Sequence, residues 1–299
     1  MSIFSKLRTK KIIILLLIIF IGLTVWSIFS VWSSAHYPKV NHFHFADSDL
    51  QKGKGIKLLV LADLHDHEFD PSEVDFTTLI SDQDPDIILL AGDMLNSYSE
   101  DSSLACTFVE SLSSIAPVYY AMGNHELDYM ETHPELVEEL EAAGAEVLDK
   151  AYEDIEVNGV HLRVGGMYDY AFALDGNNST DSEAMDSEVY SFLSEFQNTE
   201  NFKIMLSHRP DSFIFGDASK EWDIDLVISG HLHGGQVVLP ILGGLYGGDQ
   251  GWFPEYVHGL YEKDNIHLFV TSGLSTNKKI VPRFNNPPEI AVITLESEN

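Results

Sequence analysis

Short apolar segments that end abruptly in polar residues recur along the chain from residue 56 onward. Each stays apolar over about four to seven residues instead of alternating, which is typical of strands buried on both faces in a sheet that helices cover. We therefore predict five strands, which are IKLLVLA before Asp63, DIILLAG before Asp93, PVYYAMG before Asn124, KIMLS before His208 and DLVISG before His231.

Helical periodicity is found between these strands, and the alternation of strand and helix predicts an α/β fold. A capping box at Thr132 and Glu135 is expected to open one of the helices. The stripes that we expect to face inward are Leu104, Phe108, Leu112 and Ile115, then Leu136, Leu140 and Val147, then Val189, Phe192, Leu193 and Phe196.

Between residues 146 and 170 the pattern changes to alternation around Asn158-Gly159, which predicts a β-hairpin. A hairpin beside strands that helices connect means that the sheet is mixed or that there are two sheets. Residues 171–187 are polar and turn-rich, so we expect a surface loop there. No convincing domain boundary lies between residues 40 and 299.

The segment 12–32 carries no charge and is long enough to span a bilayer, which requires about 20 apolar residues. The positive-inside rule predicts a single-pass protein of the cell membrane with its N-terminus in the cytoplasm and the remainder outside, because basic residues precede the segment at Lys6, Arg8, Lys10 and Lys11. A cleaved signal ending near Ser33-Ser34-Ala35 is the alternative, but signal cores usually have only about 7 to 15 apolar residues. We expect a basic tail at 1–11, an anchor at 12–32, a linker with the first strand at 33–54 and one domain at 55–299.

The chain has 299 residues, with 17 Lys and Arg against 47 Asp and Glu, and a formal net charge of -30. Such an excess of acid would repel a nucleic-acid backbone, so we expect no nucleic-acid partner. Because four of the basic residues and none of the acidic ones precede the anchor, the outer part is more acidic still, and we expect an anionic lipid surface to repel it. The single cysteine, Cys106, excludes an internal disulfide and is interpreted as a small apolar residue.

Residues of metal-binding type follow every predicted strand, and strand ends are where open α/β sheets place their sites. Their carboxylate, imidazole and amide groups suit manganese, iron or zinc. The set is too large for one tetrahedral ion, whereas two ions that share a carboxylate fit its size and would clamp the attacking and leaving oxygens of a displacement at phosphorus. The residues are Asp63, His65, Asp93, Asn124, His125, His208, His231 and His233.

Each motif alone occurs by chance in many proteins, and an isolated histidine at a strand end is more often structural. Packing does not readily explain all of them after five separate strands. In order, the motifs are Asp63-Leu64-His65, Gly92-Asp93, Gly123-Asn124-His125-Glu126, His208 and Gly230-His231-Leu232-His233. Over about residues 40–297 this set resembles the calcineurin-like metallophosphoesterase superfamily. The runs GHLHGGQ at 230–236 and VPRFNNPPEI at 281–290 resemble its membrane-associated or exported bacterial branch.

The resemblance implies a four-layer sandwich in which two mostly mixed β-sheets are flanked by helices. It also implies that Asp93 bridges two metals, that a metal-bridging hydroxide attacks phosphorus, and that His125 is the general acid that protonates the leaving group. Imidazole suits this role because it titrates near neutral pH. The remaining ligands would be Asp63, His65 and His233 for the first metal and Asn124, His208 and His231 for the second.

We therefore expect a metal-dependent phosphoric ester hydrolase that holds two divalent ions of manganese, iron or zinc and cleaves phosphodiester or phosphomonoester bonds, with a phosphodiesterase favoured over a phosphatase. Its substrates would be small-molecule or lipid-linked phosphate esters of the envelope, because the N-terminal helix holds the site near the bilayer. The alternative is a non-catalytic envelope protein whose metal centre binds a phosphorylated lipid or polymer, although a binder has no need of a proton donor such as His125. The sequence favours no oligomeric state.

Several residues beside the motifs have simpler expected roles. Asp66 and His67 are expected to support a loop, and Glu126 to orient His125 or to cap the following helix. Arg209 and Arg283 are expected either to hold substrate phosphate or to form surface salt bridges. Gln236 is expected to donate a hydrogen bond near the ligands.

Overall fold

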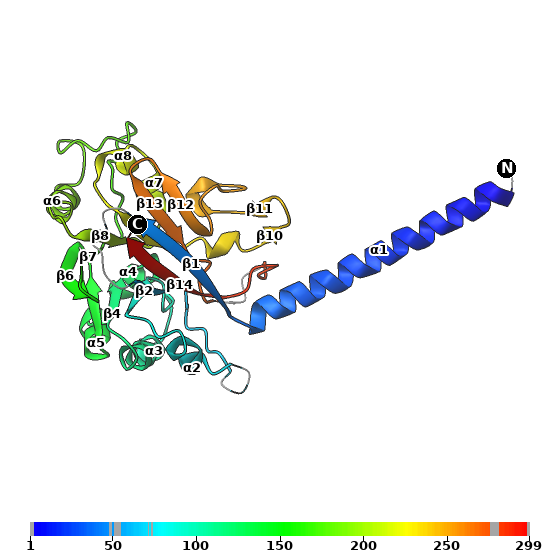
Figure 1. Cartoon of the computed structure of the whole chain (residues 1–299), viewed down its shortest axis with the longest axis horizontal. Coiled ribbons are helices and arrows are strands. Elements are labelled where there is room, and N and C mark those ends of the chain that lie inside the picture. The colour runs from blue at the N-terminus through cyan, green and yellow to red at the C-terminus, as the bar shows by residue number, and fades with distance from the viewer. Residues whose placement is uncertain are drawn as a thin grey trace.

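Two six-stranded sheets pack face to face, with helices on their outer sides (Figure 1). The computed structural model describes residues 3–47, 50, 55–70, 72, 74–275 and 281–297, with side chains from residue 10 onward. The predicted sandwich of two mixed sheets is confirmed. Lys6 and Arg8, on which the predicted orientation partly depends, and parts of the 33–54 linker lie outside the described side chains and residues.

The first sheet has the order β1-β14-β2-β3-β4-β5. Its strands are parallel to their neighbours except at the β14–β2 pair, which is antiparallel. Three of the predicted strands, β2, β3 and β4, therefore lie side by side with their carboxyl ends at one edge. The bounds are β1 Lys39–Asp47, β2 Ile56–Leu61, β3 Ile87–Ala91, β4 Val118–Ala121, β5 Ala145–Leu148 and β14 Glu289–Ser297.

The second sheet has the order β12-β13-β9-β8-β7-β6, with antiparallel pairs at its two ends and parallel strands between them. The predicted hairpin joins β6 to β7, and its turn residues Asn158 and Gly159 have φ angles of 55° and 82°, as a type I′ turn requires. A two-stranded ribbon of β10 and β11 lies outside both sheets. The bounds are β6 Ala151–Val157, β7 Val160–Gly166, β8 Phe202–Leu206, β9 Leu226–Ser229, β10 Val238–Leu239, β11 Gly243–Gly244, β12 Gly259–Lys263 and β13 Ile266–Val270.

Successive side chains of the central strands face two different apolar cores. In β2, Leu58 and Val60 point into the core between the sheets, whereas Leu59 and Leu61 pack against the helices. This double burial is the reason why these strands are continuously apolar. The helices are α2 Phe76–Ser81, α3 Ser103–Ser113, α4 Asn124–Met130 and α5 Leu136–Ala142 beside the first sheet, and α6 Ser187–Phe196, α7 Asp211–Ile214 and α8 Ala218–Glu221 beside the second; the short 3-10 turns are η1 His233–Gly235 and η2 Gly248–Gln250.

The predicted capping box at Thr132 and Glu135 is wrong. Glu135 is the N-cap residue of α5 but makes no side-chain capping bond, and the Thr132 hydroxyl donates instead to the Tyr129 carbonyl at 3.3 Å. The helix also ends earlier than its stripe indicated, because Gly144 adopts a φ of 103° that turns the chain. Val147 consequently lies in β5 and not on the helix.

Helix α1 (Ile3–His36) projects away from the domain, and only the last turns of this helix pack against the domain (Figure 1). The Trp26 and Phe284 rings meet edge to face with centroids 5.1 Å apart. The Ser30 hydroxyl accepts a bond of 2.7 Å from the backbone N–H of Asn285. Residues Lys10–His36 are long and apolar enough to cross a membrane, a criterion that a signal sequence also satisfies.

Candidate metal centre

The carboxyl ends of β2, β3, β8 and β9 and the beginning of α4 bring the predicted metal-binding residues together. Since β2 and β3 belong to the first sheet and β8 and β9 to the second, the site lies where the carboxyl ends of strands from both sheets come together. Within each of three overlapping groups, one candidate ligand atom per residue lies within 4.8 Å of the others. The groups are Asp63, His65 and His233, then His65, Asp93 and His125, then Asp93, His208 and His231.

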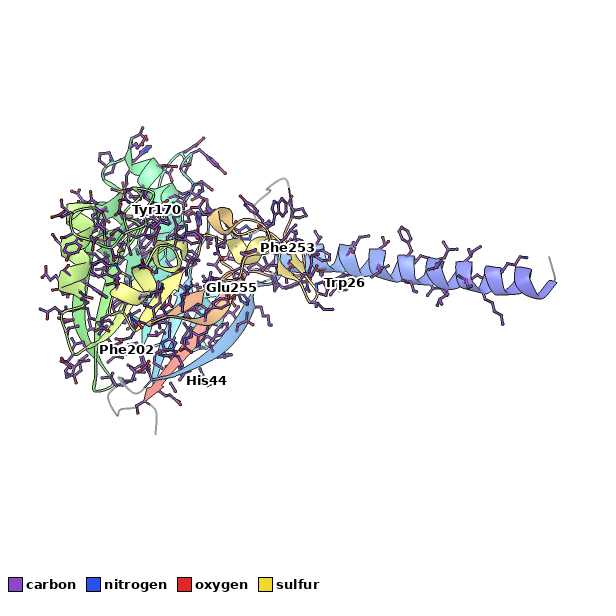
Figure 2. The ribbon with its side chains drawn as sticks, turned by 90° about the horizontal axis from the view of Figure 1, so that it is seen from above. Trp26, His44, Tyr170, Phe202, Phe253 and Glu255 are labelled. Carbon is purple, nitrogen blue, oxygen red and sulfur yellow. The ribbon has the colours of Figure 1, made fainter. Side chains whose placement is uncertain are left out.

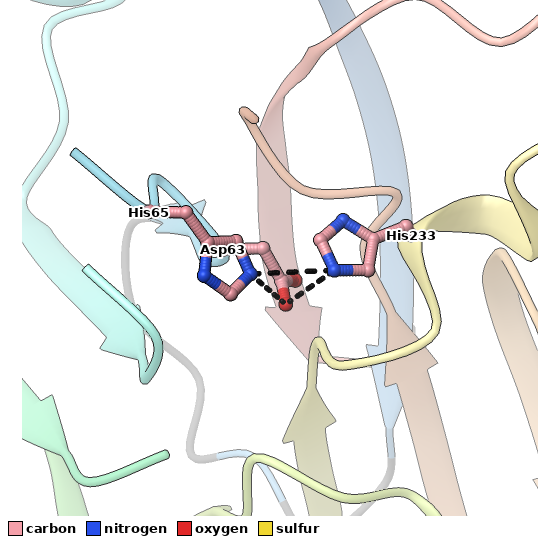
Figure 3. Close-up of side chains that lie close together, drawn as sticks. All are labelled: Asp63, His65 and His233. Atoms are coloured by element: carbon pink, nitrogen blue, oxygen red, sulfur yellow. Dashed lines mark hydrogen bonds and ion pairs between the residues drawn. The ribbon is translucent and has the colours of Figure 1, made fainter. Parts of the chain in front are cut away.

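The first group faces three candidate ligand atoms toward one point (Figure 3). The Asp63 Oδ1 atom lies 3.8 Å from His65 Nε2 and 3.6 Å from His233 Nε2, and the two Nε2 atoms are 3.3 Å apart. All three residues are buried. A buried carboxylate oxygen facing two imidazole nitrogens is a donor set that suits a borderline divalent cation.

Asp93 stands between the groups. Its Oδ2 atom lies 3.1 Å from His208 Nε2, 3.7 Å from His65 Nε2 and 4.0 Å from His125 Nε2, while its Oδ1 atom accepts the backbone N–H of His125 at 2.9 Å. Burial raises the pKa of Asp93, but the neighbouring imidazoles, that of His208 above all, outweigh burial and hold this pKa well below its usual range. The carboxylate is thus placed and ionised as a bridging ligand must be.

The hydrogen bonds of His208 direct its second ring nitrogen into the site. Its Nδ1 atom lies 2.6 Å from the Ala91 carbonyl, which can only accept, so Nδ1 carries a proton and Nε2 is directed toward Asp93 and toward His231 Nδ1, 3.2 Å away. Burial lowers the pKa of His208, but the Asp93 charge outweighs it and raises this pKa to about 9. The raised pKa means that Nε2 also carries a proton in the metal-free ring. A bound metal ion would displace this Nε2 proton.

Asn124 supplies a direct test of whether a cation fits. Its side-chain oxygen is shielded from solvent and has no hydrogen-bond partner among the described residues. An unsatisfied buried oxygen is unfavourable by about 1–3 kcal/mol, and a metal ion would satisfy it. The donor set of carboxylates, imidazoles and this amide oxygen therefore fits divalent metals.

His125 is more exposed than three of the other histidines at the site. Its side chain is 25% exposed, against 9% or less for His65, His208 and His233. Its Nδ1 atom accepts the backbone N–H of Ser97 at 3.0 Å, so in the neutral ring the proton resides on Nε2, the atom that faces Asp93. His125 can therefore present an N–H to a ligand at the mouth of the site.

Backbone strain and close approach are concentrated at these strand ends. A Cβ on Gly123 would lie 2.1 Å from Asp93 Oδ1, and one on Gly230 would lie 2.7 Å from Asp63 Oδ2. These glycines are needed because the chain passes directly beside the carboxylates. Left-handed φ angles, which are unfavourable for side-chain-bearing residues and concentrate at functional sites, occur at Asp63 (55°), His65 (49°), Asp93 (57°), His231 (69°) and His233 (47°).

Glu126 links the loop after β3 to the beginning of α4 through hydrogen bonds. It is fully buried, and its carboxylate accepts the backbone N–H groups of Asp93, Met94 and Gly123 and the hydroxyl of Tyr120 at 2.7 to 2.8 Å. The bond from Gly123 caps α4, which confirms the capping role. Its link to the Asp93 loop was not predicted, since a single Glu after the GNH motif carries no sign of a partner 33 residues away.

Both arginines donate hydrogen bonds to residues outside the candidate ligand set. Arg283 is buried and donates to the carbonyls of Ser275, Ser272 and Gly273, so it braces the loop that passes beneath Asp63, and the expectation of a surface salt bridge there is wrong. Arg209 pairs with Asp249, as the salt-bridge interpretation expected.

The remaining neighbours support loops. Asp66 accepts the backbone and side-chain N–H groups of Asn96, which confirms its loop role, and His67 packs edge to face on Phe69. Gln236 donates to the Val281 carbonyl and not toward the ligands. One supporting residue was missed, namely Asn286, whose amide donates to the His233 carbonyl at 2.7 Å. The asparagines of VPRFNNPPEI were the available signal.

Comparison with known proteins agrees with this geometry. Residues 56–235 match the family described as calcineurin-like phosphoesterase, a stretch that covers more than half of the chain and contains every candidate ligand. The chain belongs to the calcineurin-like phosphoesterase family. As a member of that family it is a metal-dependent phosphoesterase, so the predicted metal and phosphoester chemistry is confirmed at this level.

The calcineurin-like phosphoesterases similar to this chain include bacterial proteins. An uncharacterized metallophosphoesterase of Campylobacter jejuni is 27% identical over 301 residues, covering 96% of this chain and 72% of that protein. The phosphodiesterase YaeI of Escherichia coli is 28% identical over 243 residues, covering 80% of this chain and 82% of YaeI. Among solved structures, the NAD nucleotidase of Haemophilus influenzae aligns with a TM-score of 0.44 and 17% identity, over 75% of this chain and 46% of that one.

Proposed function

We propose that this chain is a membrane-anchored phosphoesterase that holds two divalent metal ions and cleaves phosphodiesters, with lipid-linked or other envelope phosphates as its substrates. One observation carries the proposal of two metals: Asp93 Oδ2 lies between His65 Nε2 and His208 Nε2, so two candidate ligand groups share one carboxylate. The first ion would be held by Asp63, His65 and His233, the second by Asn124, His208 and His231, with Asp93 bridging both.

When bound, two such ions would polarise the phosphoryl group, neutralise its charge and lower the pKa of water. The residues of the chain itself hold the ligands in position and supply the proton for the leaving group. Asp63 accepts the backbone N–H of His231 and Glu126 accepts that of Asp93, and these bonds hold the strained ligand loops in place. His125 presents its Nε2–H at the mouth of the site, where it would protonate the departing oxygen of the ester.

The diester preference is supported by a named relative, since YaeI is called a phosphodiesterase. The envelope location is supported by α1, whose Lys10–His36 stretch can span a membrane. Together these features favour an ester that is presented at or near the outer surface of the bilayer.

Hydrolysis of bis(4-nitrophenyl) phosphate by the full-length chain in detergent tests the reaction. We expect turnover with manganese, iron or zinc and its loss with a chelator. Absence of turnover with all three, despite two bound ions per chain, would favour a non-catalytic metal-centred binder and overturn the proposal.

Two variants separate the roles of the residues. Asp93→Asn should abolish turnover and bind fewer than two ions, because an amide is a poor bridging ligand. His125→Ala should keep both ions and lose about 100-fold or more in kcat, with the smallest loss for substrates whose leaving group needs no proton. Equal losses for good and poor leaving groups would contradict the acid role of His125.

A further inference from the structure

Large apolar side chains lie exposed on segments at the side of the domain from which α1 projects (Figure 1). They come from the ribbon of β10 and β11, from the loop that follows it and from the segment that begins at Val281. We call them the interfacial patch, and its members with their exposed fractions are Ile241 (105%), Leu242 (61%), Tyr246 (51%), Trp252 (69%), Phe253 (51%) and Val281 (48%). A soluble surface seldom gathers so many, and such a patch marks a contact with another apolar phase.

A continuous series of contacts joins the interfacial patch to α1. Trp26 of α1 packs on Phe284, which pairs with Val237 at the start of the ribbon. The ribbon continues to the patch, where the Tyr246 and Trp252 rings lie 5.5 Å apart. Seen from above, Phe253 lies on the side of the domain from which α1 projects (Figure 2). The contacts through Phe284 place the ribbon next to the segment that packs against the helix.

The length of α1 sets the height of this contact above the bilayer. Ile12 is the first residue after the basic cluster. At a rise of 1.5 Å per residue, Trp26 lies about 21 Å further along the helix, whereas a hydrocarbon core is about 30 Å thick. Trp26 would thus still be inside the apolar layer, and a tilted helix would place it deeper. Because the domain already contacts α1 at this level, a water layer has no room between this face and the lipid.

We infer that the interfacial patch rests in the headgroup region of the bilayer that α1 enters. The inference depends on the proposed function only for the membrane anchor. Tyr and Trp concentrate at this level of membranes because their rings are amphipathic. The acidic character of the whole domain opposes contact with anionic lipid. On this face Asp249 is paired with Arg209, whereas Glu255 is exposed close to Phe253 (Figure 2). The expected partner is therefore a zwitterionic or mixed lipid surface.

The same loop borders the metal centre, so membrane contact has a chemical consequence. A Cβ on Gly248 would lie 3.8 Å from His231 Nε2, and Asp249 bonds to Arg209, the neighbour of His208. Residues 246–253 thus connect the interfacial patch to the rim of the site. With the patch in the headgroup layer, phosphate esters of lipid headgroups reach the centre without leaving the bilayer.

Quenching by spin-labelled lipid tests the patch in the full-length chain. In a Cys106→Ser background, single cysteines at Ile241 and at Trp252 carry an environment-sensitive fluorophore, and the chain is reconstituted in phosphatidylcholine vesicles with nitroxide near the headgroup or, in a parallel sample, at the middle of the acyl chain. Ile18→Cys on α1 reports the anchor through the mid-chain nitroxide, because this residue lies deep in the hydrocarbon core. Leu174→Cys is the matched control, because Leu174 is also exposed (71%) but lies in the loop between β7 and α6, and α6 is on the side of the domain away from α1 (Figure 1).

We expect lipid quenching at the I241C, W252C and I18C positions and none at L174C. Quenching at I18C with the patch positions behaving like L174C would overturn the inference and leave the anchor standing. Absence of quenching at I18C would overturn the membrane anchor and the inference together. A blue-shifted emission at I241C and W252C without lipid quenching would assign the patch to a protein contact and likewise overturn the inference. Both patch side chains are exposed, so cysteine there should not disturb folding.

Discussion

Replacement of Glu126 by Gln perturbs the site without touching any candidate ligand. The carboxylate accepts four donors at 2.7 to 2.8 Å, two on each oxygen: the N–H groups of Asp93 and Gly123 on Oε2, and Met94 N–H and the Tyr120 hydroxyl on Oε1. Four donors around one side chain indicate an ionised carboxylate. Burial above all, and also the Asp93 charge, raise the pKa of Glu126, whereas the hydrogen bonds from Tyr120 and the Asp93 backbone oppose this rise.

In the Glu126→Gln variant, the best orientation of the new side-chain amide keeps its oxygen on Asp93 and Gly123. Its NH2 group then faces Tyr120, whose hydroxyl can rotate and accept, and Met94 N–H, which cannot accept. One charge-assisted bond of about 1.5–3 kcal/mol is lost and one buried N–H is left unpaired at about 1–3 kcal/mol, so the free energy of unfolding should fall by about 2.5 to 6 kcal/mol. Because Glu126 ties the Asp93 loop to the start of α4, metal affinity should fall about 10- to 100-fold.

Denaturant unfolding of the metal-free full-length chain in detergent measures the stability, and titration calorimetry measures metal affinity. Glu138→Gln is the control, since it is the same change on the exposed face of α5. If E126Q unfolds within about 0.5 kcal/mol of the parent and binds metal equally well, Glu126 is already neutral in the native state and the argument for a charged clamp is refuted.

Two other predictions concern packing and pH. Gly123→Ala places a Cβ 2.6 Å from the Asp93 backbone nitrogen and should abolish metal binding measured by elemental analysis. The control Gly55→Ala, in which the nearest contacts of the new Cβ are at 3.4 Å, should bind metal normally. Full metal occupancy in G123A would contradict the close-approach argument. Burial raises the pKa of Asp225 to about 6, so its contribution to stability is present below the unfolded pKa of 3.8 and is lost as pH rises through 6. The unfolding free energy of the parent relative to Asp225→Asn should therefore fall by about 2 to 3 kcal/mol between pH 4 and pH 7, and a flat difference would show that Asp225 is solvated.

The candidate ligands could be found in the sequence because each follows a strand that is buried on both faces. Continuous apolar runs identify such strands, and an abrupt change to Asp, Asn or His after a run is visible without coordinates. The hairpin at Asn158-Gly159 and the helix containing Val189 and Phe196 were predictable for the same reason, since turn chemistry and helical periodicity are local.

Supporting contacts were not predictable, because they join residues that are distant in the chain. Glu126 looked like a helix cap and is also the clamp of a loop 33 residues earlier. Arg283 looked like a surface cation and is buried against carbonyls beneath Asp63. Val147 continued a helical stripe until Gly144 turned the chain into β5.

The amino-acid sequence alone determined which chemical groups this protein gathers, because strand burial, turn residues and ligand types can each be recognised within a short segment of the chain. Only the tertiary structure decided that two of the five strands belong to a second sheet, so that the ligands of one centre come from both. It also decided that the last turns of α1 pack on the segment 284–286. These outcomes depend on pairing between distant segments, which local pattern does not encode.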